Sequence, residues 1–500
     1  MKKVLLINPQ IHTEFSTMEI QPPLGLLSLG TVLSKNNYKV KILDSSLGGK
    51  RKIAKYSFWH GIGNADVVNY AKDYNPDIIG LGCLFTSKWK VLVSIAEDIK
   101  KALPDVFIVT GGIYPSMEPK KSLETQSNCI DFSIIGEGEN SFLDLCNQLS
   151  NYNNINDLDQ SFFDVIKDID GIVFKKDGEI YVNPKKDYIN NLDELPFPDY
   201  DLLEGGLNQY FDNRKFSNFR LDKRNLSIMT SRSCPNKCSF CNMRFTHGDT
   251  IRYRSPENVI LEIKYLYDKY KINNILFDDD NVSLNKKRFK EICQQIIDLD
   301  FKVKWASQNG MMVNTLDDEV ISLMAKSGCV FTGLAVESGD EKIRSQVIKK
   351  SIKSDKIEKV VNSLKRNNVF VSMFFIVGFF EDTNETIEKS KKLILKTKPH
   401  LAPIMPLQLF PGTALFNTYK SKGLIYKEYD VRDIKNELYE TNIELYEGYS
   451  LNVKRWKRKL SLAYAFALFQ RPDYFFKYYD FYILGLIFRF TRVLNWFSIK

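Results

Sequence analysis

The segment that decides the fold reads Ser231-Arg232-Ser233-Cys234-Pro235-Asn236-Lys237-Cys238-Ser239-Phe240-Cys241-Asn242. Its three cysteines have the spacing Cys-x3-Cys-x2-Cys. Three thiolates in one loop can bind three irons of a [4Fe-4S] cubane and leave the fourth iron open to a chelating small molecule. Zinc also accepts thiolates, but a structural zinc site takes four ligands, and no second pair of cysteines lies near these three. His247 could be a fourth ligand in principle, although a surface or core histidine is the simpler interpretation.

Strands and helices alternate around this loop, and a strand is expected directly before it. Six strands are predicted between Leu226 and Pro411: Leu226 to Thr230, Asn274 to Phe277, Val303 to Ser307, Phe331 to Val336, Phe370 to Val377 and Met405 to Phe410. Six β/α repeats favour a partial (β/α)6 TIM-like barrel over residues 224–420, although periodicity alone does not exclude a second open sheet.

The chain before this barrel also alternates strands and helices, which predicts a doubly wound, Rossmann-like parallel sheet over residues 1–148. The expected strands are Lys3 to Asn8, Lys39 to Leu43, Ile78 to Cys83, Val106 to Thr110 and Phe132 to Ile135. Three of them end in turns suited to a ligand, because ligands lie at the carboxyl ends of strands in open α/β sheets. These turns are Asn8-Pro9, Gly111-Gly112 and Gly136-Glu137-Gly138-Glu139. Taken singly, each glycine could equally make only a tight turn.

Two other segments differ in composition from these α/β regions. Residues 149–223 are rich in Asn and Asp and contain three prolines near their end, which predicts a connector with a small hairpin at Asp177-Gly178. Residues 421–500 are expected to form a helical extension, with a basic run at 454–459 followed by an aromatic segment at 464–497. Charges interrupt that segment too often for a transmembrane helix. It can be an interfacial helix on anionic lipid or a cap packed on the barrel.

Composition narrows the class of protein. Hydrophobic residues are 44% and charged residues 26%, as in a globular protein. The net charge of +9 comes from scattered lysines rather than one basic block, so we expect no nucleic-acid partner. The eight cysteines do not form a disulfide framework, and the start of the chain does not read as a secretory signal. We therefore expect a reducing cytoplasmic location, with membrane association possible only through the carboxyl-terminal segment.

The cysteine loop resembles the signature of the radical S-adenosylmethionine (SAM) superfamily. The first domain resembles the cobalamin-binding domain of the class in which that module precedes the radical SAM barrel. The similar segments there are Pro22-Pro23-Leu24-Gly25-Leu26, Asp44, Gly111-Gly112 and Gly136-Glu137-Gly138-Glu139. Later barrel signatures are matched by Phe277-Asp278-Asp279-Asp280, Gly333-Leu334-Ala335-Val336-Glu337-Ser338-Gly339, Phe375-Ile376-Val377-Gly378 and Phe410-Pro411-Gly412-Thr413. The resemblance covers about residues 1 to 420.

The resemblance implies roles for individual residues. It implies a [4Fe-4S] cluster on Cys234, Cys238 and Cys241, with Phe240 packing near the adenine of SAM. For SAM it further implies contacts from Asp279 or Asp280 to the amino group, from Glu337 and Ser338 to ribose or carboxylate, and from Gly378 to the adenine. It also implies that cobalamin is bound by Gly111, Gly112, Gly136 and Glu137. Any one aspartate of the triplet could instead be a helix N-cap.

One motif of many cobalamin proteins, Asp-x-His-x-x-Gly after the first strand, is absent. His12 lies there without the flanking Asp and Gly. We expect a cobalamin without histidine ligation, or a first domain that binds substrate and keeps only the fold.

The leading prediction is a cobalamin-dependent radical SAM methyltransferase that acts on an unactivated carbon of a small-molecule or lipid-like substrate. The resemblance implies a reductant such as flavodoxin or ferredoxin. Alternatives are a cyclase, oxidase or rearrangement enzyme of the same class, and a non-catalytic cobalamin or redox sensor. A tRNA-modifying enzyme would carry a terminal RNA-binding module, and none is visible.

Overall fold

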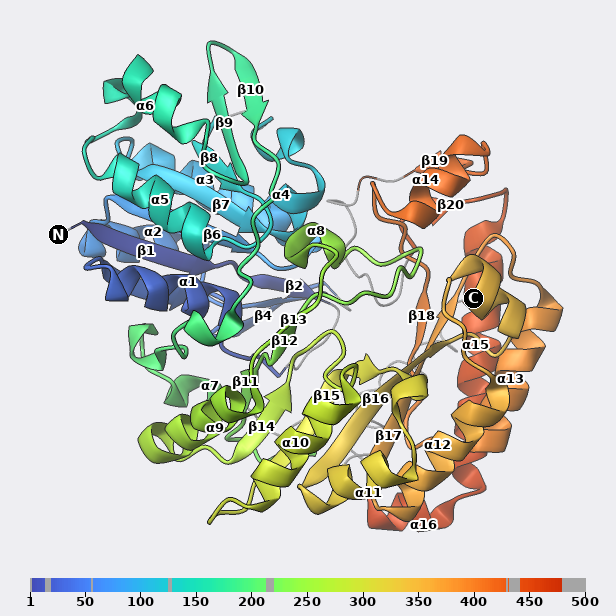
Figure 1. The fold of residues 1–500 in the computed structure, drawn as a ribbon. Helices are drawn as coiled ribbons and strands as arrows, with labels where there is room; N and C mark the ends of the chain where they lie inside the picture. Colours follow the sequence, from blue (N-terminus) through green and yellow to red (C-terminus); the bar gives the residue numbers. More distant parts are fainter. Residues whose placement is uncertain are drawn as a thin grey trace.

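Two α/β units lie side by side, and a helical segment follows them at the carboxyl end (Figure 1). The computed structural model describes residues 2–13, 19–54, 57–124, 128–212, 220–428, 430 and 441–478. The first unit is an open sheet and the second is an incomplete barrel. This arrangement is the predicted fold class.

The first sheet has seven strands in the order β10-β9-β8-β7-β6-β1-β3. Its parallel strands are β1 (Lys3–Asn8), β3 (Lys39–Asp44), β6 (Ile78–Cys83), β7 (Phe107–Gly112) and β8 (Phe132–Ile134). Each lies within two residues of its predicted bounds. The strand order changes direction at β1, as in a doubly wound sheet.

Helices cover both faces of this sheet because its strands alternate apolar side chains between the faces. Leu6 packs with α1 (Leu24–Lys35) and α5 (Glu139–Leu149). Leu5 and Ile7 point the other way, toward α2 (Asn64–Tyr74) and α3 (Trp89–Ala102). The first sheet is therefore buried on both sides, and its strand ends are the edge left for ligands.

The hairpin at Asp177-Gly178 belongs to the first sheet rather than to a free connector. Strands β9 (Ile172–Lys176) and β10 (Glu179–Val182) add to the edge of β8 in antiparallel register, with Phe174 opposite Phe132. Helix α6 (Gln160–Ile166) packs beside it. Part of the connector expected over 149–223 thus extends the first unit, because a buried apolar strand finds its partner far away in sequence.

The second unit has six parallel strands in sequence order. They are β11 (Leu226–Ile228), β14 (Asn274–Phe277), β15 (Lys304–Met311), β16 (Cys329–Glu337), β17 (Phe370–Val377) and β18 (Ile404–Pro406). No pairing joins β18 back to β11 among the described residues, so the barrel is open. The predicted last strand, Met405 to Phe410, is wrong beyond Pro406, after which the chain leaves the ladder to form a turn.

Most helices outside the barrel begin where the sequence places capping residues. Ser255, Asn285, Asp317 and Thr383 each accept a backbone N–H at the start of a helix. The helices are α9 (Pro256–Tyr270), α10 (Lys286–Ile297), α11 (Asp318–Lys326), α12 (Ser354–Arg366), α13 (Asn384–Thr397) and α14 (Ala414–Ser421).

Short elements lie between the two units and at the margins. They are β2 (Ile11–Thr13), β4 (Lys50–Ala54), β5 (Ser57–His60), α4 (Ile113–Met117), α7 (Asn208–Asp212), β12 (Ser231–Arg232), α8 (Arg244–His247), β13 (Arg252–Tyr253), β19 (Lys427–Glu428) and β20 (Ile443–Glu444). Of these, β12 and β13 form a two-stranded hairpin around the cysteine loop.

The carboxyl-terminal segment caps the barrel. Helix α15 (Tyr449–Phe469) lies along α13 (Figure 1) and buries Tyr449, Val453, Trp456 and Leu460 on one face. Helix α16 (Pro472–Lys477) follows. The remainder of the predicted aromatic segment, 479–497, lies outside the described residues. No described helix is both long and apolar enough to cross a membrane.

Candidate functional site

The cysteine loop begins directly after β12 and is held from several sides. Ser239, between the second and third cysteines, donates its backbone N–H to Ile348 O (3.0 Å) and its hydroxyl to Val347 O (2.7 Å). Its carbonyl accepts the N–H of Leu415 (2.7 Å). The loop is therefore fixed against the segment after β16 and against the start of α14.

The three thiols of this loop differ from the other cysteines of the chain. Cys234, Cys238 and Cys241 are partly exposed, whereas the remaining five cysteines are buried. Burial raises the pKa of Cys238, and it raises the pKa of Cys241 to about 11. Only these three thiols can reach a bound group.

The described residues show no ready site for a single metal ion. No three His, Cys, Asp or Glu side chains of the described residues converge on one metal position. A single zinc ion would need such convergence, whereas each cysteine of a cubane binds its own iron. His247, the only candidate fourth ligand, points to Glu137 instead, with 3.3 Å between Nδ1 and Oε1.

The three aspartates after β14 differ in their hydrogen bonds. Two of them accept hydrogen bonds from protein groups, and the third has an oxygen that accepts none. Asp278 accepts the amides of Gln308 and Asn309 from β15, and burial raises its pKa to about 6. Asp279 is buried and accepts Thr230 N–H (3.1 Å), Thr230 Oγ1 (2.7 Å) and Ser231 Oγ (2.5 Å). Asp280 keeps its Oδ2 buried without a hydrogen bond.

Asp279 therefore holds the strand that leads into the cysteine loop. Asp280 keeps a polar atom for a ligand, and so does the next residue, Asn281, whose Nδ2 is also buried and unpaired. None of the three is the helix N-cap, which is Asn285.

Glu337 ends β16 in a left-handed backbone conformation, with φ of 67°. Its Oε1 accepts the Nζ of Lys350 (2.7 Å), and both side chains are buried. Burial alone would lower the pKa of Lys350, but the charges of Glu337 and the cluster-loop thiols raise it. Ser338 is also engaged, since its carbonyl accepts Arg344 Nη1 (2.6 Å) and its hydroxyl accepts Asp340 N–H. Sequence reasoning missed Lys350, because no motif singled it out.

Phe240 and Gly378, both expected near the adenine, lie close together. The ring of Phe240 is 6.4 Å from that of Phe379, the residue after Gly378. Gly378 has φ of 109°, and its carbonyl accepts Tyr449 OH (2.5 Å). A Cβ at this position would lie 2.6 Å from that hydroxyl. The close approach of α15 therefore requires a glycine at this position.

The glycine turns of the first unit meet at one edge of its sheet. Gly111 and Gly112 end β7 beside Gly82 and Cys83 of β6. Gly112 has φ of 108°, and a Cβ there would lie 2.4 Å from Cys83 O. Next to them Leu84 and Phe85 are 68% and 51% exposed although apolar. These two residues, which sequence reasoning missed, give the edge an apolar surface suited to a large flat ligand.

The Gly136–Glu139 loop turns toward the cysteine loop. Gly136 donates its N–H to Ser116 Oγ (2.9 Å). Glu137, expected at cobalamin, is buried in a bidentate pair with Arg252, with both Nη–Oε distances 2.8 Å. Glu139 pairs with Arg232 at 2.6 Å. Burial alone would raise the pKa of Glu137, but hydrogen bonds from His247 and Arg252 and the charge of Arg232 hold it well below its usual range.

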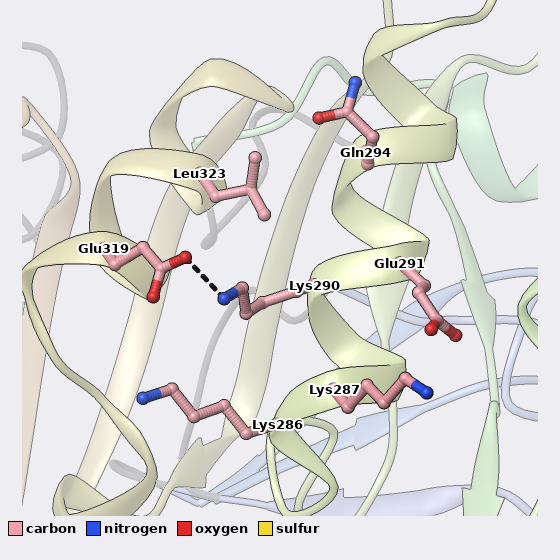
Figure 2. Close-up of a pocket in the computed structure, with 7 residues that line it drawn as sticks. All are labelled: Lys286, Lys287, Lys290, Glu291, Gln294, Glu319 and Leu323. Carbon is pink, nitrogen blue, oxygen red and sulfur yellow. Dashed lines mark hydrogen bonds and ion pairs between the residues drawn. The ribbon is translucent and has the colours of Figure 1, made fainter.

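Two further features belong to other parts of the molecule. His12 lies in β2, with its ring 6.1 Å from that of Trp59 in β5. A hollow of about 740 Å³ opens between α10 and α11 on the outside of the barrel, where Lys290 pairs with Glu319 (Figure 2). Exposed lysines and glutamates line much of it, so it is not the site around the cysteines.

Comparison with known proteins gives the same division of the chain. A family model described as the Radical SAM superfamily matches residues 228–394, and one described as a B12 binding domain matches residues 17–145. The chain is a radical SAM enzyme with an amino-terminal B12-binding domain. Its cofactors are accordingly a [4Fe-4S] cluster, SAM and cobalamin, and the free thiols, the unpaired Asp280 oxygen and the apolar sheet edge fit them.

Individual relatives agree with this family. An uncharacterized methyltransferase, PH0819, of Pyrococcus horikoshii is 29% identical over 85% of this chain and 84% of its own length. An anaerobic magnesium-protoporphyrin IX monomethyl ester cyclase of Rubrivivax gelatinosus is 25% identical over 70% of this chain and 60% of its own length. The fold is shared with the radical SAM methyltransferase TsrM from Kitasatospora setae, at a TM-score of 0.66 and 15% identity, over 85% of this chain and 79% of that one.

Proposed function

We propose that this protein is a methyltransferase that adds a methyl group to an unactivated carbon of a small-molecule or lipid-like substrate. The observation that carries the proposal is the meeting of two edges: the carboxyl ends of the first sheet face the cysteine loop of the barrel across direct contacts. Asn242, next to Cys241, contacts Met117 of α4 in the first unit, with 3.8 Å between Nδ2 and Sδ. A methyl carrier in the first unit and a radical source in the barrel would thus lie on opposite sides of one site.

The barrel residues have separate tasks in this proposal. Cys234, Cys238 and Cys241 would hold the cluster, and Phe240 would pack near the adenine. Asp280 would accept the SAM amino group, since its buried Oδ2 has no hydrogen-bond partner in the protein. Asp279 would position the loop rather than bind SAM.

The Glu337 and Lys350 pair offers charges of both signs beside this site. Glu337 would meet the ribose, and Ser338 would keep the turn after β16 in place. Gly378 would let the backbone approach the adenine.

The first unit would bind the corrin on Gly111, Gly112 and Gly136. The glycines let the backbone come close, and the exposed side chains of Leu84 and Phe85 would cover apolar ring surface. Cobalamin supplies a carrier for the methyl group, while the cluster and SAM supply the radical that activates the substrate carbon.

The partners follow from the chemistry and from the surface. Radical formation takes one electron, for which a flavodoxin or ferredoxin is the proposed donor. Lipid contact is proposed for the outward face of α15, where Leu462, Phe466 and Phe469 are exposed beyond the basic residues Lys454 and Arg455. We propose no nucleic-acid partner and a cytoplasmic location.

The test is anaerobic reconstitution with iron, sulfide and hydroxocobalamin, followed by reduction in the presence of SAM that carries a deuterated methyl group. The proposal expects 5'-deoxyadenosine, S-adenosylhomocysteine and deuterated methyl on the corrinoid, measured by mass spectrometry. Cys238→Ala should abolish 5'-deoxyadenosine because it removes one cluster ligand. The corrinoid should still bind that variant.

The alternatives give different patterns in the same experiment. Formation of 5'-deoxyadenosine without S-adenosylhomocysteine or labelled corrinoid would exclude methyl transfer and leave cyclisation or oxidation. Absence of both products, with both cofactors bound, would indicate a sensor and contradict the proposal.

A further inference from the structure

Four charged side chains, three of them buried and one partly buried, join the first unit to the strands around the cysteine loop. They are Glu137 from the loop after β8, Glu139 at the start of α5, Arg232 of β12 and Arg252 of β13, and we call them the charge junction. We propose that the charge junction positions the two cofactors, by holding the corrin-binding edge of the first sheet at a set distance from the cluster loop.

The geometry of the charge junction is closely specified. Arg252 donates both Nη atoms to the two oxygens of Glu137, and donates further to Ile189 O (2.9 Å) and His247 O (2.7 Å). Glu137 Oε2 also accepts the N–H of Ile189 (3.1 Å). A bidentate pair of this kind restricts rotation as well as distance.

A second link runs beside the first. Arg232 donates to Glu139 at 2.6 Å and lies 3.4 Å from Glu137, and Glu139 also accepts Ser28 Oγ from α1 (2.7 Å). Two carboxylates thus face two guanidinium groups, so the charges balance. His247 adds a ring nitrogen to the same Glu137 oxygen.

The low exposure of the charge junction distinguishes it from the surface charges that keep a protein soluble. The side chain of Glu137 is 2% exposed, those of Glu139 and Arg252 are also buried, and that of Arg232 is 12% exposed. Burying charged groups is costly, and a buried ion pair adds little net stability. We therefore attribute the role of the charge junction to the geometry that it fixes and not to stability. The interaction joins loops from two units and not residues within one core.

The charge junction lies next to the residues proposed to bind the cofactors. Arg232 is followed by Ser233, whose φ of 74° turns the chain into the cysteine loop, and Cys234 comes next. On the other side Glu137 follows Gly136 of the corrin edge. A shift of the Glu137–Arg252 pair would therefore move one cofactor relative to the other. Glu137 itself has its oxygens engaged by protein groups and acts as a positioning residue.

The test uses a spectroscopic signal that reports the separation of the two cofactors. Cob(II)alamin and the reduced cluster are both paramagnetic, so the cluster accelerates the spin relaxation of cobalt by an amount that falls steeply with distance. Full-length protein loaded with both cofactors would be measured by electron paramagnetic resonance as wild type, Glu137→Gln and Glu139→Gln. We expect loss of the fast relaxation in Glu137→Gln and a partial loss in Glu139→Gln.

A matched control is available inside the barrel. Glu262 of α9 is also 2% exposed and also pairs with an arginine, Arg254, but both residues belong to the barrel. Glu262→Gln removes the same chemistry without touching the contact between the units, so the relaxation should equal that of the wild type. Equal relaxation in wild type, Glu137→Gln and Glu262→Gln would overturn the proposal, as would a wild type without any cobalt–cluster coupling.

A second measurement covers a variant that fails to take up its cofactors. Hydrogen exchange of the cofactor-free protein should be faster over residues 231–247 in Glu137→Gln than in Glu262→Gln. If faster exchange is confined to residues 136–139 and 189, the junction does not reach the cysteine loop and the inference fails.

This inference rests on the two cofactors of the proposed function, but not on methyl transfer. If labelled methyl never reaches the corrinoid while the relaxation differs between the variants as expected, the proposed reaction fails and the positioning role stands. The opposite pattern would retain the reaction and reject the role of the charge junction.

Discussion

Two acidic motifs end parallel strands in this molecule, and they have different roles. In the first unit Glu137 and Glu139 are both paired with arginines from the strands around the cysteine loop. In the barrel Asp278 and Asp279 are also hydrogen-bonded within the protein, but Asp280 keeps a buried oxygen unpaired. Both motifs read as ligand contacts in the sequence.

The difference teaches how a carboxylate at a strand end should be judged. Burial makes an unpaired oxygen costly, so its partner is either a protein group or a ligand. Where the protein supplies enough donors, as it does for Glu137 and Asp279, the acidic residue holds two loops together. Where donors are missing, as for Asp280, a ligand group is the natural partner.

The largest expected effect is on the stability of the fold. It tests the carboxylates whose hydrogen bonds come from the protein. Asp279→Ala leaves the Thr230 and Ser231 donors unpaired in a buried place, so the free energy of unfolding should fall by about 3 kcal/mol or more. Urea denaturation of the cofactor-free protein measures it. Asp280→Ala is the control and should change that free energy little, because it breaks no protein hydrogen bond to Oδ2. Equal losses in the two variants would remove the distinction between them.

A smaller effect is expected on the binding of SAM. It tests the carboxylate that has an unpaired oxygen, Asp280. Asp280→Asn keeps the size of the side chain but removes its charge, so SAM should bind roughly 10- to 100-fold more weakly to the cluster-loaded protein, as expected for one charge-assisted hydrogen bond. Equilibrium dialysis with SAM measures this. Unchanged affinity would mean that another residue meets the amino group.

The third prediction concerns Glu137 of the first unit and the dependence of the unfolding free energy on pH. The pKa of Glu137 is depressed from the usual 4.5, so its stabilising effect is fully present above about pH 4.5 and is lost as the pH falls toward the folded-state pKa. The unfolding free energy of the cofactor-free wild type should therefore fall below pH 4.5, and more steeply than that of Glu137→Gln. Parallel pH curves for the two proteins would contradict the depressed pKa.

The smallest expected effect concerns Gly378, whose carbonyl is held by Tyr449. Tyr449→Phe removes one hydrogen bond and should reduce the unfolding free energy by about 1 kcal/mol. Tyr446→Phe serves as the control, because the Tyr446 hydroxyl accepts a longer hydrogen bond, 3.4 Å from Asn452 Nδ2, and the ring that packs against Tyr449 is kept. A loss of SAM affinity in Tyr449→Phe beyond this change would mean that α15 also shapes the adenine side of the site.

Most strands could be predicted because their apolar residues are contiguous in sequence. The strands Lys3–Asn8, Ile78–Cys83, Asn274–Phe277 and Phe370–Val377 have the bounds expected. The sequence alone predicts a connector around the hairpin at 172–182, because the pairing of this hairpin with β8 is a long-range contact that no local pattern reveals. The same applies to Lys350, whose partner Glu337 lies on another element.

The sequence by itself determined the chemistry that this protein can carry. The spacing of Cys234, Cys238 and Cys241 indicates the cluster, and the resemblance of the first domain, glycine turns included, to a cobalamin-binding domain implies the corrin. Both signals depend on residues that are neighbours along the chain. Only the tertiary structure decided how the acidic residues divide. Whether a carboxylate binds a ligand or an arginine depends on donors that reach it from other elements: Thr230 and Ser231 for Asp279, Arg252 for Glu137, and no protein donor for the Oδ2 of Asp280.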